Sequence, residues 1–207
     1  MEKKPLLLTA VAILTGIAAL AFVYSRLAGS SPSANLKPFE YLGQQAGEET
    51  ARLLGNQGKV VAIWERFEGR PNPNAEAQLK GFKTAMDRNK GLTLTESKEF
   101  VRALSDDPRL WPAGQAASFV KMGAGADAVV LFVTMPMSLS PEDVSVLKAS
   151  QTKFVIVGGQ SPILNSLIEQ KAVQLAIVNR IPPKPAGAGP ETPVQWYARV
   201  FMVVKPL

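Results

Sequence analysis

The sequence contains neither cysteine nor histidine, and these two absences exclude several kinds of site. Without cysteine there is no disulfide, no thiol nucleophile and no thiolate ligand for an iron–sulfur cluster. Without histidine there is no Ser-His-Asp triad, and without either residue there is no ordinary zinc site. We therefore predict a protein that is not an enzyme, with no catalytic residue, no metal site and no cofactor.

The short motifs that resemble catalytic or nucleotide-binding signatures lack their necessary context. Ser118 and Lys121 form an S-x-x-K string, but neither S-D-N nor K-T-G accompanies it. Gly123, Gly125 and Ala128 fit the dinucleotide pattern G-x-G-x-x-A, but here a predicted helix precedes the glycines and a strand follows them. The motif requires the opposite order, so these glycines are interpreted as a helix stop and a turn.

The net charge of +6 does not indicate nucleic-acid binding, because part of it lies at the N-terminus. Lys3, Lys4 and Arg26 carry three of the positive charges and Glu2 carries one negative charge, which leaves an excess of only +4 for residues 27–207. No basic run with interleaved aromatic residues occurs. We predict no nucleic-acid partner.

Residues 6–24 form a long apolar segment without a charged side chain. As a helix, this segment would span about 30 Å, enough to cross the hydrocarbon core of a bilayer. Lys3 and Lys4 precede it and only Arg26 follows closely, which predicts a cytoplasmic N-terminus. The expected order is a cytoplasmic tail at 1–4, a transmembrane helix at 5–25, a flexible tether at 26–40 and an extracytoplasmic domain at 41–207. Ser30 stands where a lipoprotein would have cysteine, so no lipid is expected there.

Hydrophobic periodicity after the tether predicts alternating helices and strands. The expected helices cover residues 41–54, 75–89, a segment between Pro112 and Gly123, a segment from Ser140 to Ala149, and one that begins at Ser161 and Pro162. The expected strands cover residues 59–64, 92–101, 128–134, 154–157, 173–178 and 194–204. This alternation predicts an α/β, Rossmann-like parallel sheet with helices on both faces, preceded by one transmembrane helix.

Several strings along this domain resemble the C-terminal lobe of the type I periplasmic sugar-binding proteins and the related repressor core domains. Residues 58–63 resemble its first strand, residues 77–86 its R-x-x-G-F-x-x-A-[LM] helix, residues 126–130 its next strand, residues 154–159 the strand that reaches the ligand, and residues 164–182 the return to the hinge. The resemblance implies half of a two-lobe fold that encloses a sugar between its lobes.

Two departures from that family concern the residues that contact sugars. Gln78 stands where the family commonly has an arginine, and Gly159 where it commonly has an aspartate. Both losses argue against tight binding of a monosaccharide. We therefore expect a non-catalytic accessory subunit whose periplasmic domain docks on a larger complex of the bacterial inner membrane, such as a respiratory or photosynthetic complex, while residues 6–24 lie in the lipid bilayer.

The alternative is a membrane-tethered module that binds or senses a sugar-like solute, with a cleft that dimerisation would complete. In parallel sheets, ligands bind at the carboxyl ends of the strands. The candidate surface for docking or for a ligand therefore comprises Trp64, Glu65, Arg66, Gln78, Met135, Met137, Gly159 and Gln160.

Overall fold

The computed structural model describes residues 35–107, 110–159, 161–187 and 189–206. Residues 36–207 form one compact unit. The predicted transmembrane helix, the tail before it and most of the tether lie outside the described residues. Among the residues that are described, no helix is both long and apolar enough to cross a bilayer.

The domain contains a six-stranded sheet in the order β2-β1-β3-β4-β5-β6. The strands are β1 (Gly58–Phe67), β2 (Leu92–Arg102), β3 (Ala128–Phe132), β4 (Lys153–Val157), β5 (Leu175–Asn179) and β6 (Phe201–Val204). The first five are parallel to their neighbours, whereas β6 pairs with β5 in the antiparallel sense. The predicted α/β class is confirmed, with a mostly parallel sheet in place of a wholly parallel one.

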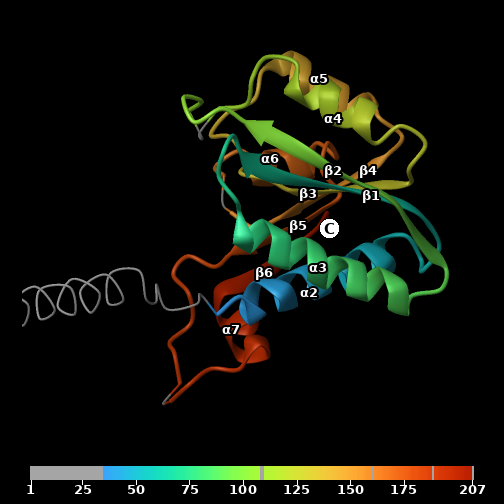
Figure 1. Ribbon diagram of the computed structural model, residues 1–207. Coiled ribbons are helices and arrows are strands. Elements are labelled where there is room, and N and C mark those ends of the chain that lie inside the picture. The colour runs from blue at the N-terminus through green and yellow to red at the C-terminus, as the bar shows by residue number, and fades with distance from the viewer. Residues whose placement is uncertain (1–34, 108–109, 160, 188, 207) are drawn as a thin grey trace, which may run out of the picture. The chain divides into compact units, whose positions relative to one another are not determined.

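Helices cover both faces of this sheet, as predicted (Figure 1). One face carries α2 (Lys37–Leu53), α3 (Pro73–Arg88) and α7 (Pro193–Val200), and the other carries α4 (Gln115–Met122), α5 (Pro141–Ala149) and α6 (Leu164–Glu169). Successive side chains of a strand point to opposite faces, so the central strands contribute to two separate cores. In β1, for example, Ile63 packs with Phe119 on the α4 side, and Ala62 packs with Phe82 on the α3 side.

The predicted start of α5 is confirmed by its capping contacts. The Ser140 hydroxyl accepts a hydrogen bond from the backbone N–H of Asp143 at 3.0 Å, and Pro141 occupies the first turn. The same helix start, a capping serine followed by proline, was predicted at Ser161 and Pro162, and that prediction was wrong. There α6 begins only at Leu164, and the Ser161 hydroxyl donates to the carbonyl of Pro136 instead.

Two other boundaries differ from the sequence prediction. The segment expected as a final strand, 194–204, is mostly the helix α7, which Thr192 and Gln195 start with a reciprocal capping box. Only its last residues form the short strand β6. The tether was predicted to reach residue 40, but α2 begins at Lys37 with a proline in its first turn.

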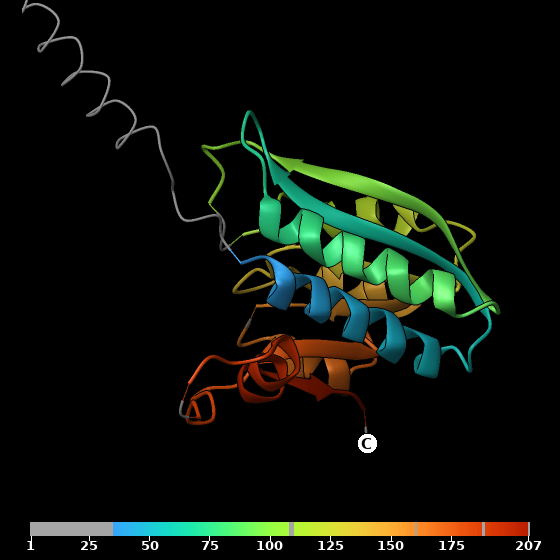
Figure 2. The same cartoon turned by 60° about the horizontal axis from the view of Figure 1, so that its bottom comes forward.

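Helices α2 and α3 lie side by side and approach each other closely at glycines (Figure 2). A Cβ atom on Gly43 would lie 1.8 Å from the carbonyl oxygen of Gln78, and one on Gly81 would lie 1.8 Å from that of Glu40. Each glycine thus allows the backbone of the facing helix to come into direct contact. This contact sets how closely the two helices lie to each other over the sheet.

Helix α7 packs on α2 and the sheet through aromatic side chains. The ring of Tyr197 lies 5.8 Å from the rings of both Tyr41 and Phe201, measured between centroids. Its hydroxyl is buried without a hydrogen bond to any described residue. Burial, followed by the negative charge of Glu49, raises the pKa of Tyr197 from 10.0 to about 12.

This raised pKa predicts a loss of stability in alkali. Below pH 10 the phenol is neutral in both the folded and the unfolded chain, so its contribution is fully present there. Between about pH 10 and pH 12 the unfolded chain releases this proton first, so the free energy of unfolding falls. We expect the free energy of unfolding of Tyr197→Phe, measured by urea titration at each pH, to fall less steeply across this range than that of the wild type. Parallel curves for the two proteins would contradict the assignment.

Candidate functional site

A cavity of about 210 Å³ lies where β1, β3 and β4 reach their carboxyl ends. Helix α2 contributes Phe39 to its wall, and the first turns of α3 contribute several polar side chains. The lining residues are Phe39, Glu65, Asn72, Asn74, Ala75, Gln78, Phe132, Val133, Thr134, Val157, Gly158 and Gly159. Ligands of open parallel sheets bind at this edge, so this cavity is the candidate site.

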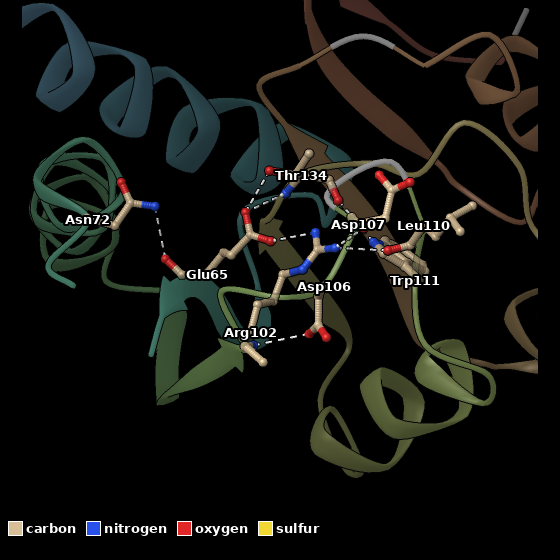
Figure 3. Close-up of polar contacts among 9 residues, drawn as sticks. Glu65, Asn72, Arg102, Asp106, Asp107, Leu110, Trp111 and Thr134 are labelled. Atoms are coloured by element: carbon tan, nitrogen blue, oxygen red, sulfur yellow. Dashed lines mark hydrogen bonds and ion pairs between the residues drawn. The ribbon is translucent and has the colours of Figure 1, made fainter. Parts of the chain in front are cut away.

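The one carboxylate in the cavity wall, that of Glu65, is held from two sides (Figure 3). One oxygen accepts hydrogen bonds from the backbone N–H and the hydroxyl of Thr134, at 3.1 and 2.6 Å. The other accepts from the Arg102 guanidinium at 3.0 Å. Glu65 is 3% exposed and Arg102 is 1% exposed, so this ion pair is screened little by solvent.

Arg102 also binds the segment that follows β2 (Figure 3). Its second terminal nitrogen donates to the carbonyls of Asp107 and Leu110, at 2.6 and 2.9 Å. The indole N–H of Trp111, which follows, donates to the carbonyl of Thr134 at 2.9 Å. The buried pair therefore ties the ends of β1, β2 and β3 to one connecting segment.

This arrangement limits what Glu65 can do chemically. Both carboxylate oxygens already accept hydrogen bonds from the protein, so Glu65 shapes the wall and fixes Thr134 rather than acting as a base or a ligand of a cation. Among the described residues, no group of three or more acidic side chains is placed to hold a metal ion. The cavity is suited to binding by hydrogen bonds and apolar contact.

Asn72 places the start of α3 on the cavity. Its side-chain oxygen accepts a hydrogen bond from the N–H of Ala75 at 3.2 Å, and its amide nitrogen donates to the carbonyl of Glu65 at 3.1 Å. One side chain thus caps the helix and joins it to β1. The side chains of Asn74 and Gln78, in the next turns, make no hydrogen bond with another described residue, so their amides are available to a ligand.

Loss of this cap has a predictable effect on stability. We expect Asn72→Ala to lower the free energy of unfolding by about 0.5–2 kcal/mol, because it removes the cap and leaves the N–H of Ala75 without its acceptor. Asn72→Asp keeps the acceptor and should lose less. Urea denaturation of both variants measures the difference, and equal losses would show that the capping bond contributes nothing.

The structure brings together only part of the predicted surface. Glu65, Gln78 and Gly159 line the cavity. Trp64 packs with the core under α2 and α3, and Arg66 pairs with Glu99 at 3.0 Å.

The remaining predicted residues have other positions. Met135 is buried in the core under α4, whereas Met137 is half exposed, and neither lines the cavity. Gln160 lies outside the described residues. Three of the predicted residues therefore line the cavity. That the other predicted residues contribute to a ligand or docking surface stays a prediction.

The sequence prediction missed several residues of the site. Asn72 and Asn74 lie in a loop rich in Gly, Pro and Asn, and the position of Asn72 just before a proline and a helix was the available signal. Phe39 was assigned to the tether. Arg102 gave no signal, because a single arginine at the end of a strand is normally at the surface.

Comparison with known proteins gives structural similarity only. No protein-family model matches the chain, and no curated protein matches it in sequence. The solved structures that match include an ABC transporter solute-binding protein from Burkholderia graminis C4D1M in complex with D-arabinose, with a TM-score of 0.53 at 13% identity over 80% of this chain and 59% of that one. The XylFII molecule matches with a TM-score of 0.50 at 13% identity over 82% of this chain and 61% of that one.

A glucose-galactose binding protein from Geobacillus stearothermophilus, GanP, matches with a TM-score of 0.47 at 16% identity over 68% of this chain and 47% of that one. GanP is named as a sugar-binding protein and the Burkholderia graminis protein is in complex with D-arabinose, and the chain spans 47–61% of the length of the three proteins. The predicted resemblance to half of the two-lobe fold is thereby confirmed.

Proposed function

We propose that this chain binds a small sugar-like solute in the cavity at the carboxyl ends of β1, β3 and β4. The observation that carries the proposal is the cavity itself, whose lining includes Phe39 and Phe132 beside Asn74 and Gln78. Sugars present apolar C–H faces beside hydroxyl groups, and aromatic rings and amides suit these two features respectively. The structural likeness to a protein in complex with D-arabinose supports the same class of ligand.

The size of the cavity sets the expected affinity. Dedicated small-molecule sites have about 300–1,000 Å³ and cover most of the ligand. The present cavity has about 210 Å³ and belongs to a single lobe, so one side of a bound sugar would stay in water. We therefore expect dissociation constants of about 1 mM, unless a second protein covers the open side.

A thermal-shift and calorimetric titration of the full chain with pentoses and hexoses, starting with D-arabinose, tests this function. Gln78→Ala removes one amide from the wall and should weaken binding by about 2- to 13-fold, the value of one hydrogen bond. Gln57→Ala is the matched control, because Gln57 is exposed and follows α2 near the opposite end of β1. Absence of binding by any sugar, or equal weakening in both variants, would refute the proposal.

A second candidate function is docking on another protein, as expected for an accessory subunit of an inner-membrane complex. Large apolar side chains at or after the carboxyl ends of β2 and β3 favour it: Val101, Leu104, Leu110 and Met137 are each about half exposed. In this proposal the domain is extracytoplasmic and residues 6–24 anchor it in the bilayer. Purification in mild detergent, followed by mass spectrometry, tests it, and Leu104→Ser with Leu110→Ser should release the co-purifying subunits.

A further inference from the structure

Strand β2 forms a long free edge of the sheet. It has 11 residues and hydrogen-bonds to β1 alone among the described strands. Its residues Thr95, Ser97, Glu99 and Val101 are exposed. In Figure 2 β2 forms the rim of the sheet, and no described helix lies outside it. Such an edge presents unpaired backbone groups to a further strand.

The direction of these backbone groups follows from one contact at the end of the strand. The N–H of Glu68 donates to the carbonyl of Arg102 at 2.8 Å, so the backbone of Arg102 faces β1. Alternate residues of a regular strand direct their hydrogen-bonding groups to opposite sides, and β2 pairs regularly with β1 from Glu96 to Arg102, after a bulge at Thr95. Lys98 and Glu96 therefore also face β1, and Ser97 and Glu99 present their N–H and C=O groups at the free edge.

The charges on β2 select one way of pairing with a second copy. Glu96 and Lys98 lie two residues apart on the same face of the strand, 2.6 Å apart between their charged atoms. In an antiparallel pair centred on Ser97, Glu96 of each copy lies directly opposite Lys98 of the other. Pairs centred on Glu96 or on Lys98 would instead oppose like charges, which destabilises a sheet.

We propose that two copies of this chain associate through β2, in antiparallel pairing about a two-fold axis at Ser97. The two Ser97 residues exchange backbone hydrogen bonds at the axis, and two Glu96–Lys98 pairs form across the interface. The sheets of both copies become one continuous sheet. The inference is independent of the proposed ligand, because the antiparallel arrangement places the two cavities at opposite ends of the joined sheet.

Charge reversal tests the register. Glu96→Lys and Lys98→Glu should each raise the dissociation constant of the dimer by tenfold or more in analytical ultracentrifugation of the full chain, because each creates two like-charge pairs. An equimolar mixture of these two variants should form a heterodimer, because every pair across that interface is again of opposite charge. A wild-type chain that is monomeric at all concentrations, or a dimer unaffected by either reversal, would overturn the proposal.

Cross-linking and a proline test the same interface independently. The chain has no cysteine, so Ser97→Cys introduces a single thiol, and opposed residues at a hydrogen-bonded position have Cα atoms close enough for a disulfide. Ser118→Cys, exposed on α4, is the matched control. We expect oxidation to link the first variant and not the second, and equal linking of both would overturn the proposal.

Ser97→Pro removes the N–H at the free edge while leaving the bonds between β1 and β2 intact. It should give a folded monomer by circular dichroism and ultracentrifugation. A folded Ser97→Pro variant that still dimerises as the wild type does would likewise overturn the proposal.

Discussion

Glu65→Gln is expected to lower the free energy of unfolding by about 3–5 kcal/mol, although the two side chains have nearly the same shape. The substitution removes the negative charge that faces the guanidinium of Arg102, a residue that is only 1% exposed. It also presents an amide nitrogen to groups that donate hydrogen bonds. Urea denaturation followed by circular dichroism measures the loss.

Two further variants separate the charge from other effects. Glu40→Gln breaks an exposed pair with Lys80 and should cost less than about 1 kcal/mol. Replacing both buried partners, Glu65→Leu with Arg102→Met, should recover only part of the loss, because the buried charges are gone but Thr134 and the carbonyls of Asp107 and Leu110 lose the groups they bind. If Glu65→Gln cost no more than Glu40→Gln, the buried pair would not stabilise the fold as described.

A second large effect is expected where α2 and α3 touch. Gly43→Ala and Gly81→Ala each place a methyl group 1.8 Å from a carbonyl oxygen of the facing helix, so the helices must separate. Overpacking of this kind costs about 1–3 kcal/mol and sometimes more, and the intolerant backbone contact here predicts about 3 kcal/mol. This outweighs the gain that alanine normally gives in a helix, about 1 kcal/mol.

Gly187→Ala is the matched control, because a Cβ atom there meets nothing within 4 Å. It should leave the midpoint of thermal unfolding nearly unchanged, whereas Gly43→Ala and Gly81→Ala should lower it by several degrees. If either helix variant were as stable as the control, α2 and α3 would not pack as tightly as the structure indicates.

The elements that sequence could predict are those whose signal is local. The apolar run of β3 and the capping serine before α5 each determine an element through neighbouring residues alone. Helix α7 was missed because its apolar residues also suit a strand, and the capping box of Thr192 and Gln195 was overlooked. The antiparallel course of β6 follows from that helix, so it was missed as well.

The site was less predictable, because it depends on contacts between distant residues. Position near the end of a strand suggested Glu65 and Gly159 as part of a ligand or docking surface, and the structure places both in the cavity wall. Nothing near Arg102 in the sequence indicates that its charge is buried against Glu65, which is 37 residues away. Phe39 reaches the cavity only because the glycines allow α2 to lie close to α3.

The short antiparallel strand β6 has a consequence for the size of any assembly. It ends the sheet on the side opposite β2 with only four residues, and Pro206, two positions after it, has no N–H to offer. Among the described strands, β2 is therefore the only long edge able to recruit a neighbour. The proposed pairing through β2 leaves neither molecule with a long free edge among its described strands. The assembly is then a dimer and does not extend into a fibre.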